Sequence, residues 1–336
     1  MKRYLFIIAS ITYLGSAPVL AQAPFEPKQI RLVLGAAAGQ DYDVWARLIG
    51  RHIQRRLPSN PPVVTVNMPG AGHLIATNWL YNAAPRDGSV WGMVSRNAPS
   101  QAFLKAPAAK FDPLRFIWIG SPELTNRGCF AMTSSGVTQA KQLFSQELVV
   151  GGTGAGSAVS QTPALLNGLL GMKFKTIEGY QKPQDIVRAM ESGEISAICQ
   201  TVQSFMRERP HWFTTGLAKL LFTLERKPVT GLGVPTIYEF AETEDQRKVL
   251  DFYSASIELG RPIFLPPEVP EDRVDIIRKA FAATMDDKEF RDEAERLKLD
   301  VTPRSGEELQ ELIYAASTTE KRIMELTAKL TGGSIN

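Results

Sequence analysis

Two glycine-bearing turns, each between an apolar run and a helical pattern, limit what this chain can fold into. The first, GAAAGQDYD at 35–43, follows the apolar run 30–34, and the second, NMPGAGH at 67–73, follows 63–66. A strand that ends in small residues and opens a helix leaves several backbone N–H groups unpaired and pointing the same way. Together with the helix dipole, these groups suit a carboxylate or a phosphate. Neither turn carries an obvious nucleophile, so the pattern favours a protein that holds an anion over one that transforms it.

Apolar runs and helical patterns alternate along the whole chain, which predicts α/β domains with mostly parallel sheets covered by helices. The predicted strands are short apolar runs at 30–34, 63–66, 90–95, 116–120, 128–132, 148–150, 174–177, 194–199 and 220–224. Helices are predicted at 43–57, 74–81, 163–170, 183–192 and in a charged region after Pro270. No repeat array or low-complexity segment interrupts this order.

Two crossings divide the chain into domains. The predicted strand 116–120 is followed by Ser121-Pro122, which we interpret as a passage into a second domain, and the proline- and glycine-rich stretch 227–235 as the return. A chain of 336 residues also exceeds the usual size of one core. We therefore predict one domain from 22–121 with 235–336, a second from 122–234, and a hinge with a cleft between them.

The first 21 residues have the pattern of a signal peptide. Lys2 and Arg3 precede an apolar run at 4–14, and small residues lead to a predicted cleavage site after Ala21. The apolar run is shorter than the roughly 20 residues that a membrane span needs. A lipid anchor would require a cysteine at the cut, and the sequence has none there. The chain is therefore expected to be exported and soluble.

Charge and residue types argue against several classes of function. The 38 basic and 35 acidic residues are nearly balanced once Lys2 and Arg3 are removed, so no basic stripe remains for nucleic acid. No cluster of His, Cys and carboxylate residues indicates a metal site. A G-x-S-x-G elbow is absent and only 3 histidines are available as a base, so nucleophilic catalysis is not supported. We expect no metal, no cofactor and no enzymatic activity.

Cys129 and Cys199 are the only cysteines. In an oxidising compartment two such thiols often pair, and adjacent strands of the second domain would bring them together, so we predict a disulfide. Two separate buried thiols are the alternative, because free cysteine is among the most buried residue types. A C-x-x-C motif is absent, which argues against thiol redox catalysis.

A third turn of the same kind, GGTGAGS at 151–157, lies in the second domain. It lacks the lysine of a Walker phosphate loop, and Ser157 takes the last glycine slot of a dinucleotide fingerprint, although Glu178 lies near the expected place of a ribose-binding acid. A tight turn without a ligand is the simplest alternative. We predict an anion-binding loop in which backbone N–H groups and the hydroxyls of Thr153 and Ser157 donate, opposite the two turns of the first domain.

Polar residues near these turns have two interpretations each. His73 either donates to a bound carboxylate or simply begins its helix. Asp41 and Asp43 are ordinary helix caps, or one of them accepts from a ligand hydroxyl. Arg96 and Arg127 are the basic groups nearest the expected cleft, and each either pairs with a carboxylate or lies on the solvated surface.

Several short segments follow one another in a familiar order. They are 30–33 with Asp43, Ala46-Arg47 and Leu48; VNMPGAG at 66–72; APRDG at 84–88; GTGAGS at 152–157; Gly179-Tyr180; ESGEI at 191–195; and LPPEV at 265–269. Together they resemble the tripartite tricarboxylate transporter substrate-binding proteins, the TctC or Bug family. The resemblance covers nearly the whole chain after the signal peptide, and the N-x-P-G-A-G segment is its most specific part.

This resemblance implies a two-domain periplasmic binding protein with an α/β fold, whose domains close over a small ligand. It also implies a carboxylate ligand, held largely by backbone N–H groups and bridging waters and delivered to a membrane transporter of two subunits. A periplasmic monomer is expected. The first turn lacks the proline and double glycine of many members, and His73 replaces a small residue, so the resemblance does not extend to a tricarboxylate.

The predicted ligand-binding residues lie at the ends of predicted strands. They are Ala37, Ala38, Gly39, Gln40, Asp41, Tyr42, Gly72, His73, Ser95, Asn97, Thr153, Gly156, Ser157, Tyr180 and Gln200. Two alternative functions stay open: an exported α/β enzyme (a hydrolase or dehydrogenase) that uses the loop 151–157, and a sensor subunit that presents its ligand to a membrane receptor. The missing nucleophile–base pair argues against the enzyme, and the sequence does not separate sensing from transport.

Overall fold

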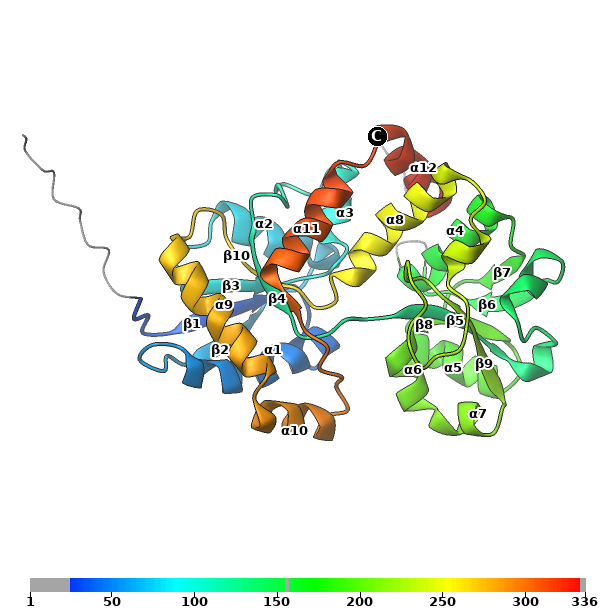
Figure 1. Cartoon of the computed structure of the whole chain (residues 1–336), viewed down its shortest axis with the longest axis horizontal. Helices are drawn as coiled ribbons and strands as arrows, with labels where there is room; N and C mark the ends of the chain where they lie inside the picture. The colour runs from blue at the N-terminus through cyan, green and yellow to red at the C-terminus, as the bar shows by residue number, and fades with distance from the viewer. Residues whose placement is uncertain (1–24, 155–156, 333–336) are drawn as a thin grey trace, which may run out of the picture.

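The protein has two lobes, each built on one β-sheet with helices on both faces (Figure 1). The computed structural model describes residues 25–154 and 157–332. The expected two-domain α/β fold is confirmed. The predicted signal peptide at 1–21 lies outside the described residues.

The first lobe holds a six-stranded sheet in the order β11-β4-β10-β3-β1-β2. Its strands are β1 (Ile30–Leu34), β2 (Val63–Asn67), β3 (Val90–Met93), β4 (Ile117–Ser121), β10 (Ile263–Leu265) and β11 (Arg304–Ser305). Its helices are α1 (Asp41–Ile53), α2 (Leu74–Asn82), α3 (Ala98–Phe103), α9 (Glu271–Met285), α10 (Lys288–Arg296) and α11 (Gly306–Ser317), with 3₁₀ turns η1 (Gln54–Arg56) and η2 (Ala71–His73). Successive side chains of a strand point to opposite faces, so Leu32 joins the core shared with α1 and α9, and Val33 the core shared with α2 and α11.

The second lobe holds a five-stranded sheet in the order β7-β6-β8-β5-β9. Its strands are β5 (Arg127–Met132), β6 (Leu148–Gly151), β7 (Phe174–Ile177), β8 (Ala197–Thr201) and β9 (Ala218–Thr223). Its helices are α4 (Ala158–Leu170), α5 (Pro183–Glu191), α6 (Val202–Glu208), α7 (Pro210–Thr214), α8 (Glu244–Glu258) and α12 (Lys321–Leu330), with 3₁₀ turns η3 (Thr133–Ser135), η4 (Ala140–Phe144) and η5 (Ile237–Phe240). The buried side chains of α4, α8 and α12 share one core with the sheet, and those of α5, α6 and α7 share the other.

Both sheets are mixed, whereas the sequence predicted mostly parallel ones. β1 pairs in parallel with β2 and β3, and β6 with β7 and β8. In contrast, β10 runs antiparallel to both β3 and β4, and β5 runs antiparallel to both β8 and β9. The reversed strands β5 and β10 are those by which the chain enters a lobe from its neighbour, because each starts at a crossing and therefore runs away from it.

The chain passes between the lobes three times among the described residues: at 122–126 after β4, at 259–262 before β10, and at 318–320 between α11 and α12. Hydrogen bonds tie the crossings to neighbouring segments. Leu124 N–H donates to the Thr302 carbonyl over 2.9 Å, and Thr125 Oγ1 donates to the Ile257 carbonyl over 3.1 Å. Arg261 N–H in the second crossing also donates to Ser121 Oγ, where the first crossing begins, over 2.9 Å. We refer to the three crossings together as the joint.

The packing places domain limits differently from the predicted boundary at 235. Ile237, Val249 and Ile257 belong to the core of the second lobe, and so does Ile323 of the last helix. The proline- and glycine-rich stretch before 235 therefore does not return the chain to the first lobe. The return follows α8, and α12 goes back to the second lobe to pack on α8 and α4.

Helix α4 starts five residues earlier than the predicted helix at 163–170. Ser157 is its N-cap, with Oγ accepting from the Ser160 N–H over 3.3 Å, and Pro163 lies inside the helix. Proline suits a first turn, which is why the sequence suggested a start at Pro163. The earlier start brings the beginning of α4 next to the loop that follows β6.

Candidate functional site

The carboxyl ends of β1 to β4 in the first lobe and of β6 to β8 in the second face the joint. β4 ends at Ser121 where the first crossing begins, and β1, β2 and β3 run in the same direction as β4. In the second lobe, Arg127 at the start of β5 pairs with Thr201 at the end of β8. In open α/β sheets ligands bind beyond the carboxyl ends of the strands. The loops after β1, β2, β3, β6 and β8 are therefore the candidate walls of a binding cleft.

The turn between β1 and α1 is organised by the buried carboxylate of Asp43. This carboxylate accepts from Gly39 N–H over 2.8 Å, from Asn67 Nδ2 over 3.0 Å and from Arg47 Nε over 2.9 Å. These partners, Arg47 first, lower the pKa of Asp43 to about 2. In the same turn, Ala37 N–H donates to Gln40 Oε1 over 3.2 Å. Two of the turn's N–H groups are thus engaged by the chain's own side chains, and Asp43 has the structural role that was one of its two interpretations.

His73 follows Gly72 after β2 and packs edge-on against the ring of Tyr42, with 5.1 Å between ring centroids. Its backbone is left-handed, with φ 76°, and its imidazole lies so close to Gly35 that a Cβ there would be 2.4 Å from the His73 Cβ. Burial and the charge of Arg261 lower the pKa of His73 to about 4. The imidazole is therefore neutral at pH 7, and its buried Nδ1 has no hydrogen-bond partner among the described residues.

Arg261 joins Tyr42 and His73 in one cluster, and it was not among the residues predicted from the sequence. Its guanidinium lies 4.7 Å from the centroid of the Tyr42 ring, and Nη2 donates to Asp41 over 3.2 Å. Its Nε is buried without a hydrogen-bond partner in the described part of the chain, 3.9 Å from Glu123 Oε2. Glu123 accepts from Trp45 Nε1 over 2.8 Å, and burial raises the pKa of this carboxyl.

Arg96 lies on the other side of Tyr42, beyond the end of β3. Its backbone N–H donates to the Tyr42 hydroxyl over 3.2 Å, and its Nη1 donates to Thr125 Oγ1 in the first crossing over 2.5 Å. Burial lowers the pKa of Arg96. Next to it, the predicted site residues Ser95 and Asn97 bond to each other, Asn97 N–H donating to Ser95 Oγ over 3.2 Å.

In the second lobe, the loop before α4 already holds a carboxylate of the chain. Glu178 Oε2 accepts from Gly154 N–H over 2.7 Å and from Ser160 Oγ over 2.9 Å. A Cβ at Gly152 would lie 2.5 Å from the same oxygen, so this glycine makes room for the carboxylate. Thr153 Oγ1 donates to Ser157 Oγ over 2.7 Å. The predicted site residue Gly156 lies outside the described residues.

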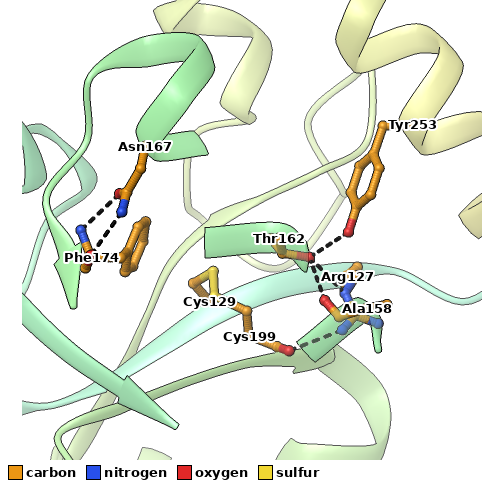
Figure 2. The surroundings of a disulfide bond; sticks show 8 residues. All are labelled: Arg127, Cys129, Ala158, Thr162, Asn167, Phe174, Cys199 and Tyr253. Atoms are coloured by element: carbon orange, nitrogen blue, oxygen red, sulfur yellow. Dashed lines mark hydrogen bonds between the residues drawn. A yellow bond between two sulfur atoms is a disulfide. The ribbon is translucent and has the colours of Figure 1, made fainter. Parts of the chain in front are cut away.

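Arg127 is buried beside the disulfide at the start of β5 (Figure 2). Its Nε donates to Thr162 Oγ1 over 3.2 Å and its Nη2 to the Cys199 carbonyl over 3.0 Å. The Thr162 hydroxyl is also hydrogen-bonded to the Tyr253 hydroxyl of α8 over 2.8 Å. Burial lowers the pKa of Arg127 to about 10. The surface interpretation of this arginine is therefore wrong.

The predicted disulfide joins Cys129 of β5 to Cys199 of β8, and both side chains are buried. The two residues face each other directly in the antiparallel register of these strands. The alternative of two separate thiols does not hold.

The predicted residues Tyr180 and Gln200 lie within the second lobe. Tyr180 donates its hydroxyl to Glu194 Oε1 over 2.8 Å, and burial together with this bond raises the pKa of Tyr180 to about 12. Gln200 lies one residue before the end of β8, and its Nε2 is buried with no partner among the described residues. Of the predicted set, Asp41, Tyr42 and His73 are thus joined into one cluster through Arg261.

Two cavities border helix α8. One, of about 750 Å³, lies between α8, α11 and the crossing at 318–320, and several charges in its wall form ion pairs, among them Arg226–Asp251 and Arg304–Glu258. The other, of about 100 Å³, lies between the lobes, and among the described residues Arg96 is the only charged one in its wall. Its remaining walls come from α3, α4, α8 and α12. The smaller cavity is thus lined by residues of both lobes and by Arg96, which forms no ion pair among the described residues.

Within residues 25–154 and 157–332 no group of His, Cys, Asp and Glu is arranged to hold a metal ion. None of the helices described there has the length and apolar character to cross a membrane.

Comparison with solved structures finds the same fold in solute-binding proteins. A ligand-free TctC solute-binding protein from Polaromonas has a TM-score of 0.70 at 19% identity, over 90% of this chain and 98% of that one. The periplasmic binding protein BugD has a TM-score of 0.60 at 21% identity, over 91% and 99% of the two chains. MatC from Rhodopseudomonas palustris, with bound malate, has a TM-score of 0.59 at 18% identity, over 89% and 98%.

No family model matches the sequence, and no curated protein matches it either. The structural matches show that the chain has the fold of the TctC and Bug solute-binding proteins over nearly its whole described length. This is the fold that the resemblance implied.

Proposed function

We propose that this protein captures a small carboxylate in the cleft between its lobes and hands it to a membrane transporter of the tripartite tricarboxylate type. The observation that carries the proposal is the cluster of Tyr42, His73, Arg96 and Arg261 at the strand ends of the first lobe. It presents guanidinium groups and a neutral imidazole where ligands of such folds bind. Guanidinium groups are the side chains best suited to carboxylates.

The ligand class is supported by a protein of the same fold, since MatC is described with bound malate. The residues do not favour chemistry. His73 is kept neutral by burial but has no nucleophile bonded to it among the described residues, and Asp43 is committed to Arg47 and Asn67. A binding protein fits this arrangement better than a hydrolase or dehydrogenase.

The proposal includes export to the periplasm, action as a monomer, and a membrane partner of two subunits. The signal-peptide pattern at 1–21 supports the first, and the resemblance supports the others. A receptor-coupled sensor has the same binding chemistry and differs only in the partner. Co-purification of the tagged protein with membrane subunits, or with a receptor, separates the two.

The ligand is tested with a thermal-shift screen of mono-, di- and tricarboxylates, including aromatic acids, followed by calorimetry on the acids that respond. A ligand that binds only the folded state raises the apparent stability, by about 2.7 kcal/mol at a hundredfold excess over Kd. We expect at least one acid to raise Tm and to bind with Kd on the order of micromolar, about −8 kcal/mol. The matching amides serve as uncharged controls.

If no acid in the screen shifts Tm, or if the amides shift it equally, carboxylate capture is contradicted. The enzyme alternative is tested on the same samples by NMR after prolonged incubation. Conversion of any responding acid would favour that alternative, and unchanged spectra are the expected result.

A further inference from the structure

Two guanidinium groups near the joint, the half-buried one of Arg96 and the buried one of Arg127, form no ion pair among the described residues. Among the described residues, Arg96 donates through its side chain to Thr125 Oγ1, and Arg127 donates to Thr162 Oγ1 and the Cys199 carbonyl. All three acceptors are neutral. Arg261, in contrast, has Asp41 at 3.2 Å and Glu123 at 3.9 Å. A buried cation without a counter-ion is costly, so an anion bound near Arg96 and Arg127 stabilises this region.

The cavity of about 100 Å³ between the lobes is where such an anion fits. Arg96, Asn97, Ser100 and Gln101 form its wall on the first lobe, and Gln161 and Tyr253 form part of its wall on the second. The Tyr253 hydroxyl is bonded to Thr162, which accepts from Arg127, so the second cation stands behind this wall. With about 30 Å³ per water in the liquid, the cavity has room for about three waters, or for a carboxylate with one carbon attached.

The glycine turns are poorer receptors in this chain than their sequence indicates. Gly39 N–H is taken by Asp43, Ala37 N–H by Gln40, and Gly154 N–H by Glu178. These bonds satisfy backbone donors that the turns would otherwise offer to a ligand. The guanidinium groups of Arg96 and Arg127 are left as donors that form no ion pair among the described residues.

We infer that the cavity beside Arg96 is a carboxylate subsite, in which the Arg96 guanidinium binds the ligand's carboxylate directly and selects a charged group over a neutral one of the same shape. The inference rests on the proposed function and deepens it, because it assigns recognition to a side chain rather than to the glycine turns. Gln161 and Tyr253 approach from the second lobe, so a carboxylate in the subsite touches both lobes at once.

Acetate and acetamide test the subsite, because they match in shape and differ in charge. The dissociation constant of ¹³C-labelled acetate is measured by NMR titration at constant ionic strength for the wild type, Arg96→Gln, Arg96→Lys and Arg115→Gln. Arg115 is the matched control: it is an exposed arginine of the first lobe, paired with Glu268 at 2.6 Å. Circular dichroism and Tm of each variant without ligand verify folding.

We expect the wild type to bind acetate and not acetamide, and Arg96→Gln to weaken acetate binding about 10- to 100-fold, the loss of one hydrogen bond to a charged group. Arg96→Lys keeps the charge and regains part of the affinity, and Arg115→Gln matches the wild type. Equal binding of acetate and acetamide, or full acetate binding by a folded Arg96→Gln, overturns the inference. If Arg96→Gln fails to fold, acetate binding by Arg96→Lys that is weaker than in the wild type but still measurable supports direct contact, and acetate binding by Arg96→Lys equal to the wild type contradicts it.

This outcome is separable from that of the proposed function. An acid from the screen that binds Arg96→Gln as well as the wild type leaves carboxylate capture intact and removes the Arg96 subsite. Acetate binding that depends on Arg96, without co-purification of membrane transporter subunits, retains the subsite and contradicts the proposed transport role.

Discussion

Single residues at the joint show which parts of the site a sequence can reveal. Tyr42 and His73 were predicted because each lies in a recognisable turn, and their rings do meet, 5.1 Å apart. Arg261 lies in no motif, and its partner Asp41 is 220 positions away along the chain. Such a contact forms because the fold brings two distant segments of the chain together, and it leaves no local pattern in the sequence.

The sequence also did not reveal that N–H groups of the glycine turns are already hydrogen-bonded to side chains of the protein itself. Glu178 was noted only as a possible ribose-binding acid. Its carboxylate accepts from Gly154 N–H and Ser160 Oγ, although the N–H groups of this loop were expected to bind a ligand. A glycine turn indicates that N–H groups converge, but not which acceptor reaches them first. That depends on the packing of β7 against β6.

Glu225 is the residue with the clearest expected pH effect. Burial raises its pKa to about 7, with Oε1 accepting from Arg127 N–H over 2.8 Å and Oε2 without a partner among the described residues. Because the pKa of Glu225 in the folded protein lies above the ordinary value of 4.5, Glu225 contributes stability that is present below pH 4.5 and is lost as the pH rises through about 7.

We therefore expect Glu225→Gln to be more stable than the wild type at pH 8, by up to about 3 kcal/mol. The difference shrinks as the pH falls toward 5. Calorimetric Tm between pH 5 and 8 measures it, with Glu147→Gln, an exposed carboxylate 3.8 Å from Lys175, as the control. Parallel pH profiles of Glu225→Gln and the wild type would falsify the assignment.

At the scale of elements, the sequence located strands and helices well and their pairing less well. The apolar runs marked nine strands, and the structure places a strand at or next to each of them. The direction of β10, only three residues long, was not predictable, because a strand's direction depends on where the chain enters the sheet. The Cys129–Cys199 pairing followed from two apolar runs that adjacent strands bring together.

Helix α4 supports a test of the second-lobe turn. Ser157 caps this helix, accepting from Ser160 N–H, so Ser157→Ala removes the cap, which costs about 1 kcal/mol. We expect the same change to weaken carboxylate binding, since the start of α4 borders the cavity beside Arg96. Thr243→Ala is the matched control, because Thr243 caps α8 in the same way by accepting from Gln246 N–H.

Calorimetry with the best acid of the screen separates the two effects. We expect Ser157→Ala and Thr243→Ala to lower Tm by similar amounts. Only Ser157→Ala is expected to bind the acid more weakly. Equal affinities in both variants would show that the beginning of α4 does not touch the ligand.

For the whole molecule, the joint determines how the lobes move. We expect three crossings to permit bending of one lobe toward the other and to restrict independent rotation of the lobes. The sequence predicted the hinge but placed the return at 235, since proline and glycine there indicate a loop and not its destination. The destination is fixed by apolar residues such as Val249 and Ile257, which pack in the second lobe.

We expect a bound carboxylate to draw the lobes together, because Arg96 and Gln161 line the cavity from different lobes. Small-angle scattering should give a smaller radius of gyration with the responding acid than without it, and no change with its amide. The Arg96→Gln variant is expected to stay at the ligand-free radius at the same acid concentration. An unchanged radius for the saturated wild type would contradict closure.

The return of α12 to the second lobe also has a consequence for how the chain is made. The first lobe needs β10 and α9 to α11 to finish its sheet and cores, and the second needs Ile323 of α12. A polypeptide emerging N-terminus first, from a ribosome or through a translocation channel, therefore completes neither lobe until almost its last residues arrive. The chain therefore stays incompletely folded for most of its synthesis or translocation. The two lobes are expected to fold at nearly the same time, once the last residues have emerged.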